Sequence, residues 1–125
     1  MSDLPQNDPD ISDQEELFRR FPVDQWVPDD KINGRRLSSA AFSNSSDGSG
    51  TSVFLSSEVS MDRILEGYER LGVAVLTAGA ARAAQQGVRR VPLEEIPGHA
   101  QIEGKKSPSV RRRLAAACEV KKKPD

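Results

Sequence analysis

The sequence predicts an α+β fold, in which two or three helices pack on a small mixed sheet of about four to five strands. Short apolar runs bounded by Gly, Pro, Asn or Ser recur along the chain, which is the pattern of strands. Two further segments, 60–71 and 108–119, place apolar residues at the spacing of a helix. The length of 125 residues suits one domain with one core.

The two ends of the chain are expected to lie outside this domain. Segment 1–16 has few apolar side chains and many acids, so it cannot bury enough surface to offset the entropy lost on ordering. We therefore expect a disordered acidic tail over 1–16, a domain over 17–119 and a frayed basic C-terminus over 120–125.

The domain is expected to begin with an irregular arm over 17–36. Two prolines interrupt this segment and exclude a helix through it. Its aromatic residues Phe18, Phe21 and Trp26 are expected to anchor the arm by packing on the domain.

A hairpin is expected to follow the arm. Segments 36–43 and 51–57 have the composition of strands and are joined by the Ser- and Gly-rich segment 44–50. Because the two segments are close in the sequence, we expect them to pair across this flexible loop.

The next segment carries the clearest helical pattern. Ser60 is a suitable N-cap, apolar residues follow at helical spacing over 60–71, and Gly72 is placed to end the helix. The continuous apolar run 73–77 then predicts a strand that is buried on both faces.

The last third of the chain is expected to alternate strands and helices. The alanine content of 78–86 favours a helix, although a strand stays open. Segment 88–93 is expected to be an edge strand, because its proline cannot donate to a neighbour. A short strand over 99–104 and a final helix over 108–119 complete the domain.

Cysteine and histidine usage limits the chemistry. The single Cys118 excludes an internal disulfide and a cysteine-based zinc site, and with one histidine no metal site is expected. No feature implies a cofactor. No apolar run is long enough to cross a membrane, and the acidic N-terminus is unlike a signal peptide, so we expect no membrane contact and a cytoplasmic location.

Charge is unevenly distributed along the chain. Residues 1–30 carry nine acids and two arginines, whereas residues 104–123 carry eight lysines and arginines and one acid. Such asymmetry is typical of proteins that contact a charged partner. Pairing between the acidic and basic ends is an open alternative.

The strand-to-helix corner at 104–108 is the candidate anion site. Ser107 is a suitable N-cap and a proline follows it, so a helix is expected to begin here. Lys105, Lys106 and Arg111 would then lie near free backbone N–H groups, an arrangement that binds phosphate. The glycine spacing does not match a nucleotide P-loop. The alternative is a simple helix cap with solvated lysines.

No catalytic constellation is recognisable, and we name no catalytic residue. His99 is the one histidine and hence the default general base of any reaction. Arg36 and Ser38 on one strand and Glu58 after another resemble the Arg/His, Ser/Tyr and Glu that surround NAD in ADP-ribosyltransferase-like domains. This resemblance covers three residues and implies a small nucleotide-using transferase as an alternative function.

These observations favour a non-catalytic binding or accessory module. Its basic corner would recognise an anionic partner, either an acidic protein or a phosphate-bearing molecule. Nucleic-acid binding through the basic segment 105–123 is a further alternative. Against it, the acidic N-terminal segment offsets the charge, and no aromatic residue lies near the basic segment in the sequence to stack on bases.

Overall fold

The structure, a computed structural model, describes residues 5–44 and 50–125. Its helices are α1 (Met61–Ile64), α2 (Ala78–Ala83) and α3 (Pro108–Ala116), with 3-10 turns η1 (Val23–Gln25) and η2 (Ser39–Phe42). Its strands are β1 (Glu16–Phe21), β2 (Trp26–Asp29), β3 (Gly34–Leu37), β4 (Thr51–Leu55), β5 (Gly72–Thr77), β6 (Gly87–Arg90), β7 (His99–Glu103) and β8 (Glu119–Lys122).

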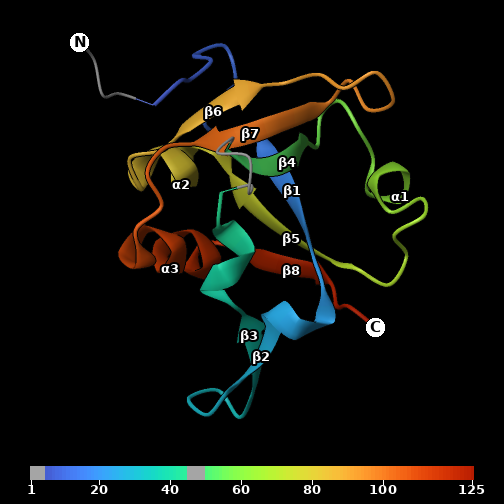
Figure 1. The fold of residues 1–125 in the computed structure, drawn as a ribbon, viewed down its shortest axis with the longest axis vertical. Coiled ribbons are helices and arrows are strands. Elements are labelled where there is room, and N and C mark those ends of the chain that lie inside the picture. Colours follow the sequence, from blue (N-terminus) through green and yellow to red (C-terminus); the bar gives the residue numbers. More distant parts are fainter. Residues whose placement is uncertain (1–4, 45–49) are drawn as a thin grey trace.

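Six of these strands form one antiparallel sheet, in the order β6-β7-β4-β1-β5-β8. β2 and β3 form a separate hairpin, which extends from the sheet on the side of α3 (Figure 1). α2 and α3 lie to one side of the sheet and α1 to the other (Figure 1). The predicted α+β class is confirmed, but the main sheet has six strands rather than about four to five.

Alternation along the strands divides the core into two clusters. On β1, Leu17 and Phe21 face the larger cluster under α2, α3 and η2, whereas Phe18 faces the smaller cluster under α1. β5 contributes to both clusters and is buried along nearly its whole length. The prediction of a strand over 73–77 that is buried on both faces is therefore confirmed.

The expected irregular arm over 17–36 is wrong, because β2, most of β1 and most of β3 lie within it. Residues 16–21 form β1, a central strand paired with both β4 and β5. The sequence of β1 does not show the apolar alternation of a strand, because Arg19 points toward the larger cluster at a position where an apolar residue is expected. Its guanidinium donates to the carbonyl oxygens of Ala41 at 2.8 Å and Ser52 at 2.9 Å. The predicted packing of the three aromatic residues on the domain is confirmed.

The expected hairpin between 36–43 and 51–57 is also wrong. β3 ends at Leu37 and pairs with β2, whereas β4 pairs with β1 and β7. The Ser38 hydroxyl accepts a hydrogen bond from the backbone N–H of Ala40 at 3.2 Å, and this cap begins η2 instead of continuing the strand. Residues 45–49 of the expected loop lie outside the described residues.

The helices are shorter than expected. α1 begins at the predicted cap, Ser60, but ends at Ile64, and Tyr68 is exposed. α2 confirms the helical alternative for 78–86 over its first six residues. α3 begins at the predicted cap and ends at Ala116, because the chain then turns into β8. The edge strand expected near 88–93 is confirmed as β6 over 87–90.

The N-terminal segment differs most from expectation. Residues 5–16 are described and held against the domain, so the tail expected over 1–16 is not seen in them. Ile11 is 2% exposed within the larger cluster, whereas most of its neighbours in this segment are exposed. The Arg82 side chain holds the segment, since it donates to Asn7 Oδ1, Asp13 Oδ1 and the carbonyl oxygen of Asp8. Residues 5–16 are therefore ordered by hydrogen bonds and by one buried isoleucine, although their low apolar content predicted disorder.

The C-terminal end is ordered as well. The frayed terminus expected over 120–125 includes most of β8, which pairs with β5. Lys122 Nζ donates to the carbonyl oxygens of Glu69 at 2.8 Å and Leu71 at 2.7 Å, so this lysine is bound rather than solvated.

Candidate anion-binding groove

A groove of about 590 Å³ lies between the β2–β3 hairpin and the segment from α3 to β8. The hairpin turns at Asn33, whose positive φ of 50° an asparagine tolerates. Asp29 Oδ1 accepts the backbone N–H of Lys31 at 3.1 Å and helps to fix the turn. On the other wall, Ser107 Oγ caps α3 by accepting the N–H of Val110 at 3.2 Å. Local caps thus shape both walls of the groove.

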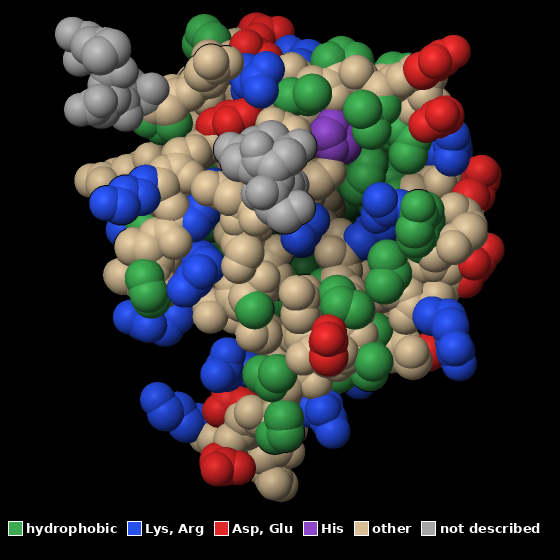
Figure 2. All heavy atoms as spheres, in the orientation of Figure 1, with side chains coloured by type: hydrophobic (Ala, Val, Ile, Leu, Met, Phe, Trp, Pro, Cys, Tyr) green, Lys and Arg blue, Asp and Glu red, His purple; other side chains and the backbone are tan. Residues whose placement is uncertain are grey.

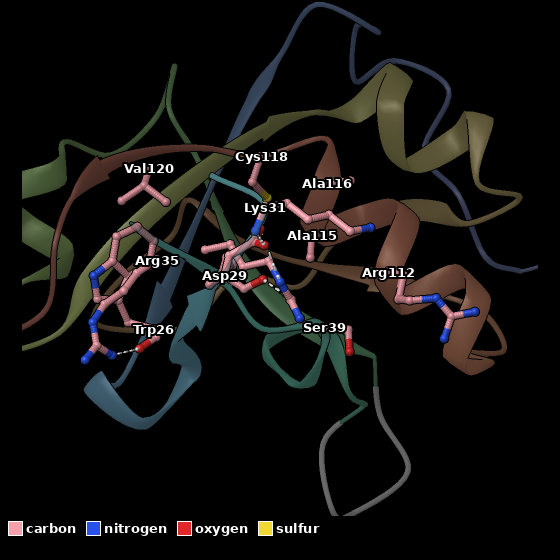
Figure 3. Close-up of a pocket in the computed structure, with 12 residues that line it drawn as sticks. Trp26, Asp29, Lys31, Arg35, Ser39, Arg112, Ala115, Ala116, Cys118 and Val120 are labelled. Carbon is pink, nitrogen blue, oxygen red and sulfur yellow. Dashed lines mark hydrogen bonds and ion pairs between the residues drawn. The ribbon is translucent and has the colours of Figure 1, made fainter. Parts of the chain in front are cut away.

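Cationic side chains line the rim of the groove. Lys31, Arg35 and Arg36 come from the hairpin and Arg112 from α3, against a single carboxylate, Asp29. All four cationic residues are exposed. Figure 3 shows Arg35 and Arg112 on opposite sides, with Asp29 and Lys31 between them. The rim therefore carries an excess of positive charge.

These cations are only partly neutralised. Arg35 donates to the carbonyl oxygen of Trp26 at 2.7 Å, and Arg36 Nε lies 3.7 Å from Asp29 Oδ2. Within the described part of the chain, the Lys31 ammonium and the Arg112 guanidinium have no hydrogen-bond or ion-pair partner. Both groups are free to contact an anion from solution.

The floor of the groove is apolar. It is formed by Trp26, Leu37, Ala115, Cys118 and Val120. The Cys118 thiol donates to the carbonyl oxygen of Leu114 at 3.4 Å, and burial raises the pKa of this thiol to about 12. It is therefore a protonated, weakly nucleophilic group at neutral pH and acts as a small apolar side chain.

Over its described residues 5–16, the acidic N-terminal segment does not cover this groove. Its carboxylates at Asp10 and Asp13 form ion pairs with Arg90 and Arg82, which belong to β6 and α2. Glu15 accepts hydrogen bonds from the hydroxyl groups of two serines after β4. Figure 2 shows basic side chains over α3, both basic and acidic side chains on the hairpin, and further acidic side chains toward the upper and right-hand margins. In the described residues, the acidic segment therefore pairs elsewhere than with α3.

The strand-to-helix corner forms as expected, but its two lysines differ in exposure and in hydrogen bonding. Lys105 is exposed, whereas Lys106 is half-buried and its ammonium donates to the carbonyl oxygens of Ile102 and Gly104 and to Asn44 Oδ1, at 2.9, 3.2 and 2.9 Å. Burial lowers the pKa of Lys106 to about 8, and Glu103 acts in the opposite direction. All three donors of this ammonium are thus occupied.

Arg111, the fourth residue of the predicted anion site, is also drawn inward. It is half-buried, and its buried Nε has no hydrogen-bond partner among the described residues. Of the four predicted residues, Ser107 caps the helix, and only Lys105 presents an exposed charge. Anion binding at this corner stays a prediction.

The different settings of the two lysines give a stability test. Lys106→Ala is expected to lower the free energy of unfolding by about 1–2 kcal/mol, because it removes a part-buried cation that binds three oxygens. Lys105→Ala should change it by less than about 0.5 kcal/mol, as for other exposed lysines. Urea unfolding followed by circular dichroism measures both values. Equal changes in the two variants would contradict the structural role of Lys106.

His99, the candidate general base, lies in a second pocket of about 330 Å³ on the α1 side of the sheet. Nδ1 lies 2.8 Å from the carbonyl oxygen of Val91 and so carries the proton, because a carbonyl only accepts. Nε2 is then the acceptor for the Ser52 hydroxyl. Burial lowers the pKa of His99, the Val91 hydrogen bond opposes this, and Arg20 lowers it further.

This arrangement gives His99 a partner that sequence reasoning did not supply. A neutral imidazole beside a hydroxyl can accept its proton, as in a base–nucleophile pair. The same two hydrogen bonds also satisfy both nitrogens of a buried ring, as burial of a histidine requires. Catalysis by His99 stays a hypothesis.

The three residues of the ADP-ribosyltransferase resemblance are not brought together. Arg36 lines the groove and pairs with Asp29. Ser38 caps η2, and Glu58 forms an ion pair with Arg90 of β6 at 3.2 Å. Because these side chains have separate partners, the structure shows no shared NAD site built from them.

Sequence reasoning missed most of the groove residues. Lys31 and Arg35 lie on the hairpin wall and Trp26 in the floor, whereas Arg112 lies on the opposite wall and comes from a segment far away in the chain. The one available signal was the basic pair 35–36 next to an Asn-Gly turn, which places positive charge at a hairpin tip. Nothing in the sequence indicated that α3 would lie beside it.

Fold and groove together define a small α+β protein with a basic, apolar-floored groove. No family model, curated protein or solved structure matches this chain. Over residues 5–44 and 50–125, no helix is both long enough and apolar enough to cross a membrane. The same residues contain no cluster of three or more His, Cys, Asp or Glu side chains that could hold a metal ion.

Proposed function

We propose that this protein is a non-catalytic binding module that recognises an anionic partner through the groove between the β2–β3 hairpin and α3. The observation that carries the proposal is the convergence of four cationic side chains with one carboxylate on a single groove. Guanidinium groups are well suited to this role because they bind phosphate or carboxylate through two parallel hydrogen bonds.

Three features support binding at the groove rather than at the strand-to-helix corner. Lys31 and Arg112 have uncommitted charges, whereas the ammonium of Lys106 is occupied by protein oxygens. In residues 5–16 of the acidic N-terminal segment, Asp13 and Asp10 pair with Arg82 and Arg90 rather than with the cations of the groove. The groove is also open to solvent and large enough for part of a macromolecular partner.

The proposal is tested by charge reversal on the two walls. The double variant Arg35→Glu/Arg112→Glu is expected to elute from phosphocellulose at a lower salt concentration than the wild type, because it replaces attraction by repulsion. The matched control is Arg70→Glu/Lys123→Glu, which makes the same change in net charge at exposed residues outside the groove. Circular dichroism confirms that each variant is folded.

Two outcomes would count against the groove. If both double variants elute together, net charge alone governs binding and the groove is not a specific site. If the loss occurs instead in Lys105→Glu, the contact lies at the strand-to-helix corner. The control is expected to elute close to the wild type and clearly after the groove variant.

A further inference from the structure

Trp26 is an aromatic residue of the groove, and binding of a simple anion does not require it. It is the only tryptophan of the chain, and it lies half-buried in the floor of the groove. One side of the ring packs toward Phe21, at 6.0 Å between ring centres and an angle of 42°. The ring is thus supported from within the core and borders the groove with its remaining surface.

The cations are arranged around this ring. Arg35 binds the carbonyl oxygen of Trp26 itself, and Arg112 stands on the opposite wall (Figure 3). Three of the four cations of the rim are arginines, whose planar groups bind phosphate and also stack on rings. An aromatic platform between arginines is the pattern with which proteins hold single-stranded nucleic acids.

We infer that the partner is a single-stranded nucleic acid, with phosphates held by Lys31, Arg35 and Arg112 and a base placed against Trp26. This inference rests on the proposed function and names the chemistry of its partner. An acidic peptide would use the same cations, but its carboxylates need no aromatic surface. The lack of an aromatic residue near the basic segment in the sequence is no longer an objection, because Trp26 lines the same groove as Arg112 of α3.

The single tryptophan provides the measurement. Titration with an oligothymidylate of about ten nucleotides, a typical site length, is expected to quench Trp26 fluorescence to a saturating value. The logarithm of the binding constant should fall with the logarithm of the salt concentration, with a slope of about −2 for about three phosphate contacts. Poly-L-glutamate of similar charge serves as the peptide-like probe.

Variants separate stacking from charge. Binding of a dye-labelled oligothymidylate, followed by anisotropy, is expected to weaken about five- to a hundredfold in Trp26→Leu. Trp26→Phe keeps an aromatic ring and should retain most of the affinity. This variant therefore shows whether the loss in Trp26→Leu comes from the missing ring rather than from misfolding. Arg112→Ala should reduce the magnitude of the salt slope by about 0.7, since one phosphate contact is lost.

The outcomes distinguish this inference from the proposed function. Salt-dependent oligonucleotide binding without quenching, and without an effect of Trp26→Leu, overturns the inference and leaves an anion-binding groove. Binding of poly-L-glutamate but not of the oligonucleotide overturns it in favour of an acidic protein. If neither probe binds, the inference and the proposed function both fail. Quenching together with loss in Trp26→Leu supports the inference.

Discussion

Replacing Ile11 by alanine is expected to lower the free energy of unfolding by about 2–5 kcal/mol. The side chain is 2% exposed and belongs to the larger core cluster, so the substitution leaves a cavity beneath the N-terminal segment. Urea unfolding measures the change. For a chain of this size the melting temperature should fall by roughly 10 °C or more.

Ile32→Ala is the matched control for Ile11→Ala. The same atoms are removed at the tip of the hairpin, where the side chain is 62% exposed, and the expected change is within about 0.5 kcal/mol. A stability loss that is equally small in both variants would mean that residues 5–16 are a detached tail in solution, as the composition alone suggested.

Phe21→Ala is expected to cost about 3–5 kcal/mol, the largest effect of any substitution considered. Phe21 ends the central strand, is completely buried and lies under Trp26. The loss therefore combines a large cavity with removal of the support of the groove floor. Thermal and urea unfolding measure the stability of the variant.

Two comparisons make the Phe21 result specific. Phe21→Leu keeps most of the volume and should cost clearly less than the alanine variant. Val23→Ala, at a side chain that is 54% exposed, should be close to neutral. A Phe21→Ala protein as stable as Val23→Ala would contradict the assignment of β1 to the centre of the sheet.

Elements with a strong local signal could be predicted from the sequence. β5 is a continuous apolar run, and α3 begins with a serine cap followed by proline. In both cases the residues that decide the structure are neighbours in the chain. Their type and approximate position were therefore readable without knowledge of the rest of the fold.

Elements that depend on distant partners could not be predicted in this way. β1 has Arg19 on its core side, and only carbonyl oxygens from Ala41 and Ser52 make that placement acceptable. The hairpin expected across the Ser- and Gly-rich loop failed for a similar reason. β4 finds its partners in β1 and β7, which lie farther away in the sequence than the segment first considered.

The groove was the least predictable feature. Charge segregation drew attention to the basic segment 104–123, but the ammonium of Lys106, one of the residues predicted to bind an anion, donates its hydrogen bonds within the protein. Arg112 is the middle one of three consecutive arginines, 111–113. The direction in which each side chain leaves the helix decides that Arg112 borders the groove. Only the tertiary structure shows that Trp26 lies in the same groove as Arg112.

The way residues 7 and 8 lie along β6 has a consequence for the solubility of the protein. The backbone N–H of Asp8 donates to the carbonyl oxygen of Val88, and Asn7 Oδ1 accepts the N–H of Val88. Asp8 Oδ2 also accepts the N–H of Arg90. These atoms occupy the positions that a strand from another molecule would need. β8, at the opposite edge, carries the exposed Lys121 and is followed by the exposed Lys123, and the charge of these two lysines discourages such pairing. The sheet is thus guarded against edge-to-edge aggregation at both ends.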